Sequence, residues 1–326
     1  MKAIIPVAGE GTRLRPHTHT IPKAMMPVAG KPIIGHILDT LISLQVNQVI
    51  LIVGHLGDKI IEFVKDSYPR LQLKSIHQKE RKGLGHAVLL AKDLVAGEPV
   101  LIVYGDTVFE GEFSGLIHRQ ADASIGVKEV EDPTRFGVVE TKGERIIRMV
   151  EKPTSFVSNL AIVGFNYVNN SPLLFECLEE LVRSSITTRG EYQLTDAFQL
   201  MVEKGAKVET FRVENWFDCG KPETLLETNR YLLEKSGLAP QVEGSVVNPP
   251  VFISGSAKVV NSIVGPYVSI ADKAIVEDSI VRNSIIGEEA EVRQCLLEGS
   301  LIGANARIKG LPYQVSLGDF SEIEIK

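Results

Sequence analysis

The sequence has 326 residues, more than one hydrophobic core usually supports, so it predicts two domains. A formal net charge of −6 disfavours nucleic acid as a partner, and three widely spaced cysteines argue against a disulfide framework. Because the sequence shows neither a signal-peptide core nor an apolar run of membrane-spanning length, we expect a soluble cytoplasmic protein without a membrane partner.

The first apolar run, residues 3–7, predicts a buried strand that ends at a glycine-rich turn. Gly9 and Gly11 allow the backbone to turn tightly and to present its N–H groups to an anion. A lone Gly-x-Gly would usually be an ordinary turn between a strand and a helix. Here three cations lie beside the turn, as a polyphosphate site requires. They are Arg13, Arg15 and Lys23.

Residues 9–16, followed by the Pro-Lys pair at 22–23, resemble the signature of the sugar-1-phosphate nucleotidylyltransferases, the nucleotide-sugar pyrophosphorylases. The resemblance implies that the loop wraps the triphosphate of a nucleotide. It also implies that Arg13 supports the departing pyrophosphate and that Lys23 contacts phosphate, so we expect both to be catalytic. The residues expected to bind the nucleotide in this loop are Ala8, Gly9, Gly11 and Thr12.

Short apolar runs alternate with helical patterns from residue 1 to about residue 236. This alternation predicts a Rossmann-like, three-layer α/β fold, with helices on both faces of a mostly parallel sheet. Ligands in that architecture bind beyond the carboxyl ends of the strands. The glycine-rich loop and Asp106 each follow an apolar strand, so they should share one edge of the sheet. We expect a nucleotidyltransferase catalytic domain over residues 1–238.

The segment 77–87 resembles the base pocket of the family, where a glutamine lies five residues before a Gly-Leu pair. Gln78 and Gly83 keep that spacing. An amide can donate to one ring carbonyl and accept from the ring N–H, which suits thymine or uracil. A solvated glutamine in a charged loop is the alternative. We expect Gln78 and Gly83 to bind the nucleotide, with dTTP or UTP favoured.

Two carboxylates, Asp106 and Asp218, are candidate metal ligands. Either one alone would more often be a turn or helix-capping residue. The resemblance implies that they share one site and bind the catalytic Mg²⁺, which proteins typically hold with one or two carboxylates plus substrate phosphates. Thr107 and Cys219 differ from the residues common in the family, which leaves the surroundings of the metal ligands open.

The Glu-Lys-Pro run at 151–153 matches the sugar side of the family's site. Outside that context, a Glu-Lys pair before proline would be ordinary surface. The resemblance implies that Glu151 holds sugar hydroxyls and that Lys152 grips the sugar phosphate near the reacting phosphorus, a task that suits a mobile point charge. Gly137 would let the hexose approach the backbone closely, and Gly164 belongs to a weaker match on the same side.

Helical periodicity ends near residue 236, and aliphatic residues then recur six positions apart, as from Ile253 to Val259, from Val264 to Ile270 and from Ile286 to Val292. This is the hexapeptide pattern of a parallel β-helix. The block resembles the short left-handed β-helix that many long nucleotidylyltransferases carry. We expect about four coils within a hexapeptide domain over 239–326. The segment from Leu311 onward breaks the pattern and is expected to cap the β-helix or to contact a neighbouring subunit of a homo-oligomer.

The resemblance implies an enzyme that joins a nucleoside triphosphate to a sugar 1-phosphate, with glucose 1-phosphate favoured, and releases pyrophosphate. Catalysis would rest on in-line positioning and on charge neutralisation by Mg²⁺ and the lysines and arginine named above. The alternatives are a mannose-1-phosphate guanylyltransferase and a non-catalytic nucleotide-sugar-binding regulatory subunit of the same fold. All seven histidines lie at or before His118, which disfavours a second, acyl-transfer activity in the β-helix.

Overall fold

The computed structural model describes residues 1–310, and its contacts divide the chain into two compact units. One unit holds Met1–Met26 and Lys31–Leu225, and the other holds Pro27–Gly30 together with the chain from Leu226 onward. Most of helix α7 (Pro222–Ser236) therefore groups with the second unit, whereas we expected it to close the first. The domain boundary stays a prediction. The segment from Leu311 lies outside the described residues.

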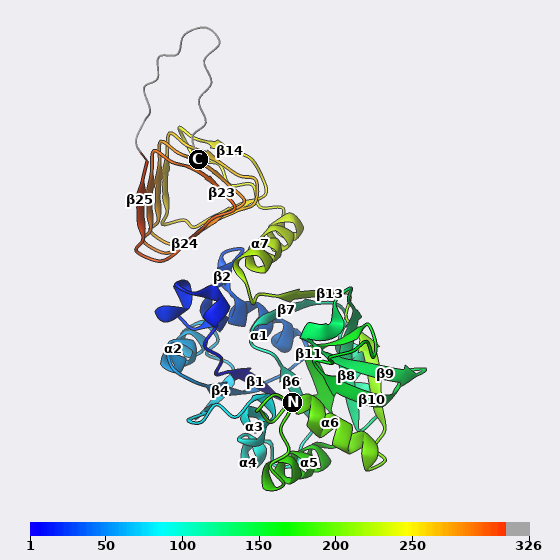
Figure 1. The fold of residues 1–326 in the computed structure, drawn as a ribbon. Helices are drawn as coiled ribbons and strands as arrows, with labels where there is room; N and C mark the ends of the chain where they lie inside the picture. The colour runs from blue at the N-terminus through cyan, green and yellow to red at the C-terminus, as the bar shows by residue number, and fades with distance from the viewer. Residues whose placement is uncertain (311–326) are drawn as a thin grey trace. The chain divides into compact units, whose positions relative to one another are not determined.

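The first unit is built on a nine-stranded sheet with the order β5-β4-β1-β6-β11-β8-β12-β10-β9 (Figure 1). The four strands from β5 to β6 are parallel, while β11 runs antiparallel to both β6 and β8, so the sheet is mixed beyond β6. The strands are β1 (Lys2–Val7), β4 (Gln48–Val53), β5 (Gln72–His77), β6 (Val100–Val103), β8 (Ala123–Glu129), β9 (Gly137–Lys142), β10 (Arg145–Glu151), β11 (Leu160–Val168) and β12 (Val208–Arg212).

Helices cover both faces of this sheet. Ile4, Ile50 and Ile102 lie in one core cluster with residues of α3, α5 and α6, while the alternate residues Ile5 and Leu51 are also fully buried. Because successive strand residues point to opposite faces, both faces must be covered, which confirms the three-layer α/β fold. The helices are α1 (Ile33–Ser43), α2 (Gly57–Ser67), α3 (Leu84–Leu89), α4 (Lys92–Val95), α5 (Ser171–Arg183) and α6 (Leu194–Glu203).

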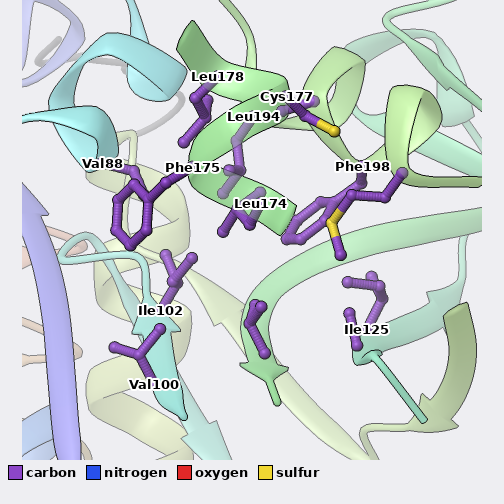
Figure 2. Close-up of a cluster of buried hydrophobic side chains, with 14 of the residues drawn as sticks. Val88, Val100, Ile102, Ile125, Leu174, Phe175, Cys177, Leu178, Leu194 and Phe198 are labelled. Atoms are coloured by element: carbon purple, nitrogen blue, oxygen red, sulfur yellow. The ribbon is translucent and has the colours of Figure 1, made fainter. Parts of the chain in front are cut away.

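The core beneath α5 and α6 joins helix residues to the sheet (Figure 2). Phe198 of α6 is 1% exposed and lies among these aliphatic side chains. We predict that Phe198→Ala lowers the free energy of unfolding by about 3–5 kcal/mol, because it removes an aromatic ring and leaves a cavity. Denaturant titration followed by the fluorescence of Trp216, the one tryptophan and part of this unit, measures the change. Phe156→Ala is the matched control, since Phe156 is 78% exposed; equal effects of both variants would contradict the prediction.

The second unit contains the predicted left-handed β-helix. Three four-stranded parallel sheets form its faces, and every coil adds one strand to each face (Figure 1). Val251, Val268 and Val276 are among the aliphatic residues that fill the interior. The first face holds β14 (Val246–Val247), β17 (Ile263–Val264), β20 (Ile280–Arg282) and β23 (Leu296–Glu298); the second holds β15 (Val251–Ile253), β18 (Val268–Ile270), β21 (Ile285–Ile286) and β24 (Leu301–Ile302); the third holds β16 (Lys258–Val260), β19 (Ile275–Glu277), β22 (Glu291–Arg293) and β25 (Arg307–Lys309).

A short segment far upstream also belongs to the second unit. The backbone N–H of Ala29 donates to Asn229 Oδ1 of α7 at 2.8 Å, and Ser269 of β18 donates to the same oxygen at 2.6 Å. Gly30 lies so close to the ring of Phe252 that an added Cβ would come within 2.5 Å of it, and its φ of +82° also favours glycine. Across the described part of the chain, no helix combines the length and apolarity needed to span a membrane.

Candidate active site

Two loops meet at the carboxyl ends of neighbouring parallel strands. The glycine-rich loop follows β1, and Tyr104-Gly105-Asp106 follows β6, which pairs directly with β1. An added Cβ on Gly105 would lie 2.2 Å from Val7 Cγ1 and 2.9 Å from the carbonyl oxygen of Pro6. Glycine is therefore what lets the loop that carries Asp106 lie against the end of β1. The shared sheet edge predicted from the sequence is present.

Two adjoining cavities open at this edge. The smaller, about 450 Å³, is lined by residues of the glycine-rich loop and by Gln78, and the larger, about 900 Å³, by the Glu151-Lys152 segment. Tyr104 and Asp106 line both cavities and so lie where they meet. We call them the nucleotide cavity and the sugar cavity, after the substrates that the resemblance leads us to expect there. All of their lining residues belong to the first unit.

The expected site residues divide between these cavities, with three exceptions. The nucleotide cavity is lined by Ala8, Gly9, Lys23, Gln78 and Gly83, and the sugar cavity by Arg13, Gly137, Glu151, Lys152 and Asp218. Arg13, which we expected beside the triphosphate, thus lines the cavity that Asp218 also lines. Gly11 and Thr12 are not among the lining residues of either cavity. Gly11 instead bends the loop, since its φ is +62° and its carbonyl oxygen accepts from the Thr18 hydroxyl at 2.8 Å.

Gly164 is the third exception. It lines neither cavity, and its φ is +83°. An added Cβ would come within 2.2 Å of the Tyr104 ring, and its carbonyl oxygen accepts from the Tyr104 backbone N–H at 2.8 Å. Gly164 therefore positions Tyr104, which itself lines both cavities.

Asp106 is tied into the site by two hydrogen bonds. Lys23 Nζ donates to Asp106 Oδ2 at 2.7 Å, and the Thr107 hydroxyl donates to Asp106 Oδ1 at 3.1 Å. Burial opposes ionisation of Asp106, but Lys23, Thr107 and then Arg13 outweigh burial and hold the pKa of this carboxyl below its usual value. Lys23 thus contacts a carboxylate, in addition to the phosphate contact expected for it. The role of Thr107 could not be predicted from the sequence; in the structure its hydroxyl orients Asp106.

Asp218 is brought beside Asp106 by a two-stranded antiparallel sheet. In β13 (Asn215–Asp218), Asp218 pairs with Thr107 of β7 (Thr107–Glu110), and the Cys219 N–H donates to the Asp106 carbonyl oxygen at 3.0 Å. Burial, and then the negative charge of Asp106, raise the pKa of Asp218. A pair of carboxylates that repel one another at the sheet edge fits a divalent cation, whose remaining ligands in proteins are often substrate phosphates.

The floor of the sugar cavity is formed by paired ends of β9 and β10, where Glu151 lies opposite Gly137. The Thr195 hydroxyl donates to Glu151 Oε2 at 2.7 Å, and Lys152 Nζ lies 3.4 Å from Glu151 Oε1. An added Cβ on Gly137 would lie 2.8 Å from Thr195 Oγ1 and 2.9 Å from Glu151 Oε2. Only glycine leaves this carboxylate undisturbed at the cavity surface.

Three further residues, two arginines and a threonine, line the sugar cavity and were not predicted from the sequence. Arg135 Nη2 lies 4.0 Å from Asp218 Oδ2, and its guanidinium stacks on the ring of Phe136. Arg189 donates to the Lys152 carbonyl oxygen at 3.0 Å, and Thr195 holds Glu151 as described above. Arg135 directly precedes the segment that we singled out, so its neighbourhood was a signal. Arg189 lies in a turn whose position depends on the tertiary fold, and the sequence offers no comparable signal there.

The amide nitrogen of Gln78 contacts protein groups, whereas we expected it to donate to the base. Its amide nitrogen donates to the Gly83 carbonyl oxygen at 3.1 Å and lies 3.1 Å from His86 Nδ1. We expected the amide both to donate to the base and to accept from it. Because the nitrogen is already engaged within the protein, the carbonyl oxygen is the amide atom left for a ligand.

The chain is similar to known proteins in both of its parts. The sequence profile described as nucleotidyl transferase matches residues 2–235, and the profile described as GlmU-like, C-terminal hexapeptide matches residues 229–309. A glucose-1-phosphate thymidylyltransferase of Streptomyces griseus is 31% identical, covering 100% of this chain and 99% of the relative. A UTP–glucose-1-phosphate uridylyltransferase of Haloferax volcanii is 35% identical, covering 74% of this chain and 100% of the relative. A solved UDP-glucose pyrophosphorylase complexed with UDP-glucose is 25% identical with a TM-score of 0.64, covering 72% of this chain and 98% of that one.

Proposed function

The chain belongs to the nucleotidyl transferase family and is a sugar-1-phosphate nucleotidylyltransferase, and from this premise we propose that it joins UTP or dTTP to glucose 1-phosphate. The observation that carries the proposal is the pair of adjoining cavities that share Asp106. One has the glycine-rich loop and an amide for the base, and the other has a carboxylate and a lysine for a phosphorylated sugar. The relatives named for thymidylyl and uridylyl transfer to glucose 1-phosphate support the choice of substrates.

The proposed reaction needs no strong base, because the sugar phosphate oxygen is already anionic at neutral pH. That oxygen attacks the α-phosphorus, the new P–O bond forms, and the bond to the β-phosphate oxygen breaks in line to release pyrophosphate. The barrier is chiefly the approach of two anions. Lys152 would hold the sugar phosphate, and Arg13 and Lys23 would offset negative charge on the triphosphate. Arg189 adds a further cation at the sugar cavity.

We propose that Asp106 and Asp218 hold Mg²⁺. Bound there, the cation would supply charge neutralisation at the phosphates. Two features support this fit: the carboxylates are neighbours, and burial together with the charge of Asp106 raises the pKa of Asp218, although the cations nearby act in the opposite direction. Lys23 and Thr107 keep Asp106 oriented and ionised for this role. A homo-oligomeric state and a cytoplasmic location stay predictions.

A substrate panel tests the proposed specificity. Pyrophosphate release is measured for UTP, dTTP, CTP, ATP and GTP, each combined with the 1-phosphates of glucose, mannose and N-acetylglucosamine. We expect UTP or dTTP with glucose 1-phosphate to give the highest kcat/KM. Preferential use of GTP with mannose 1-phosphate would instead establish a guanylyltransferase. Binding of nucleotide-sugars without turnover of any pair would establish a regulatory subunit.

Gly137→Ala tests the floor of the sugar cavity. The added methyl group would come within 3 Å of Thr195 Oγ1 and Glu151 Oε2, so it must break their hydrogen bond or tilt the carboxylate. We predict a rise of about tenfold in the KM for sugar 1-phosphate, the effect of one lost hydrogen bond, with little change in the KM for the triphosphate. Gly115→Ala is the control, because an added Cβ there meets nothing within 4 Å. A wild-type KM for sugar 1-phosphate in Gly137→Ala would refute this role.

A further inference from the structure

The amide of Gln78 is held in one orientation by its protein partners. Gln78 follows β5, is 9% exposed and lines the nucleotide cavity. Its Nε2 donates to the Gly83 carbonyl oxygen at 3.1 Å. A carbonyl oxygen can only accept, so the nitrogen end of the amide must face Gly83, and a flipped amide would place two acceptors against each other. The hydrogen-bonding groups therefore favour this orientation of the amide.

The Gly83 carbonyl is itself fixed. Gly83 has a φ of +99°, and an added Cβ would lie 2.7 Å from the Tyr192 carbonyl oxygen. Lys82, directly before it, and Gly85, two residues after it, are bonded to the same neighbour, because Tyr192 N–H donates to the Lys82 carbonyl oxygen at 2.8 Å and Gly85 N–H donates to the Tyr192 carbonyl oxygen at 2.8 Å. Gln78 thus meets a rigid acceptor.

The second N–H of the amide faces His86, in the first turn of α3. His86 Nδ1 lies 3.1 Å from Gln78 Nε2. The ring nitrogen can accept this hydrogen only in the neutral imidazole that carries its proton on Nε2. A protonated ring would present N–H at both nitrogens and would oppose the amide nitrogen. The state of His86 therefore decides whether the second N–H of the amide finds an acceptor, which adds to the hold of Gly83, or faces a competing donor.

The surroundings of His86 favour the neutral ring. Burial lowers the pKa of His86 below its usual value of 6.5, and the Lys82 ammonium lowers it further, while Glu80 acts in the opposite direction. Lys82 and Glu80 both come from the loop before α3, and they are the charged groups that act on this ring in the described part of the chain. At neutral pH the ring is neutral and can accept.

We propose that His86 is a specificity-determining residue, which locks the Gln78 amide so that its carbonyl oxygen reads the base as a hydrogen-bond acceptor. The proposal rests on the proposed function, in which Gln78 reads the base of the triphosphate. A locked acceptor selects a base that presents a ring N–H. Uracil and thymine have one at N3, whereas N3 of cytosine carries no proton and would face the carbonyl oxygen with a second acceptor. The site therefore rejects CTP by polarity, although the two pyrimidines are similar in size.

The test compares kcat/KM for UTP with that for CTP, at saturating glucose 1-phosphate, in the wild type and two variants. His86→Leu removes the second of the two acceptors that hold the amide and leaves Gly83 alone to orient it, so we expect the UTP/CTP ratio to fall by about tenfold, the effect of one hydrogen bond. His86→Gln is the matched control, because its side-chain carbonyl oxygen can still accept from Gln78, and it should keep the ratio near that of the wild type. An unchanged ratio in His86→Leu would overturn the proposal.

The pH dependence of the same ratio is a second readout, and it can be measured on the wild-type protein. Because the pKa of His86 lies below 6.5, the wild-type ring gains a proton as pH falls through that lowered pKa, and we expect the UTP/CTP ratio to fall there, whereas in His86→Gln it should stay flat. Ionisation of the triphosphate and the sugar phosphate cancels, because both nucleotides carry the same phosphate groups. The ratio is compared only above the pH at which N3 of cytosine itself gains a proton. A wild-type ratio that does not change with pH would also overturn the proposal.

The outcomes separate this proposal from the proposed function. If the wild type neither turns over nor binds UTP or dTTP, the proposed function fails, and the role of His86 fails with it. Binding is followed independently through the fluorescence of Trp216, which lines the sugar cavity. If the wild type prefers UTP to CTP but neither the variants nor pH change the ratio, only the role of His86 is refuted.

Discussion

Replacing Asp106 by asparagine is expected to lower kcat by about 10²–10³-fold, the loss typical of removing one group that stabilises charge in a transition state. Asparagine has nearly the same shape, but it is uncharged. It would weaken the proposed cation site and would leave Lys23 Nζ, now 2.7 Å from Asp106 Oδ2, without its carboxylate. Because Asp106 lines both cavities, the defect should appear whichever substrate is varied.

Pyrophosphate release measured over a range of Mg²⁺ concentrations checks this prediction. Asp106→Asn should need more Mg²⁺ for half-maximal activity, as well as having a lower maximum. Asp58→Asn serves as the control, because the Asp58 side chain is 93% exposed and Asp58 lines neither cavity. Wild-type turnover by Asp106→Asn at limiting Mg²⁺ would remove Asp106 from the proposed metal site.

Replacing Lys152 by alanine should produce the second large effect, a fall of about 10²–10³-fold in kcat/KM for the sugar 1-phosphate. Lys152 has a φ of +42°, its N–H donates to the Phe136 carbonyl oxygen at 2.9 Å, and its own carbonyl oxygen accepts from Arg189. The backbone is thus fixed at both peptide groups while the ammonium faces the cavity near Glu151. Alanine would keep the backbone hydrogen bonds and lose only the charge.

The measurement that separates the two cavities is the Kd for the triphosphate. Lys152→Ala should bind UTP nearly as the wild type does, as followed by Trp216 fluorescence, while turnover with sugar 1-phosphate collapses. Lys142→Ala is the control, because Lys142 is an exposed residue at the far end of the same β9 strand that begins at Gly137. Equal losses in UTP binding and in sugar 1-phosphate use would show that Lys152 does not serve one substrate alone.

The sheet edge could be predicted from the sequence because it depends on local rules. An apolar run of strand length followed by glycine and a charged residue marks the carboxyl end of a strand, and Gly9 and Asp106 both fit this pattern. The β-helix was predictable for a similar reason, since its coils repeat the same six-residue spacing. The antiparallel strands beyond β6 were not expected, because strand direction depends on how the chain returns to the sheet.

The finer parts of the site depend on contacts between distant segments. Lys23 and Asp106 are 83 residues apart, and Thr195 and Glu151 are 44 apart, so neither hydrogen bond has a local signal. The amide of Gln78 shows the limit most clearly. Its spacing to Gly83 marked it as a residue that contacts the base, but only the position of His86 shows that both of its donors are engaged. The sequence identifies the chemical groups, and the fold determines which of their atoms remain free.

The most direct test of the whole account follows both products in one reaction. The wild-type protein is mixed with Mg²⁺, glucose 1-phosphate and either UTP or dTTP, and pyrophosphate and nucleotide-sugar are quantified together by anion-exchange chromatography. The account predicts one pyrophosphate for each nucleotide-sugar formed, and neither product when glucose 1-phosphate is left out. Pyrophosphate release that does not depend on a sugar 1-phosphate would contradict it, as would the absence of both products with either nucleotide.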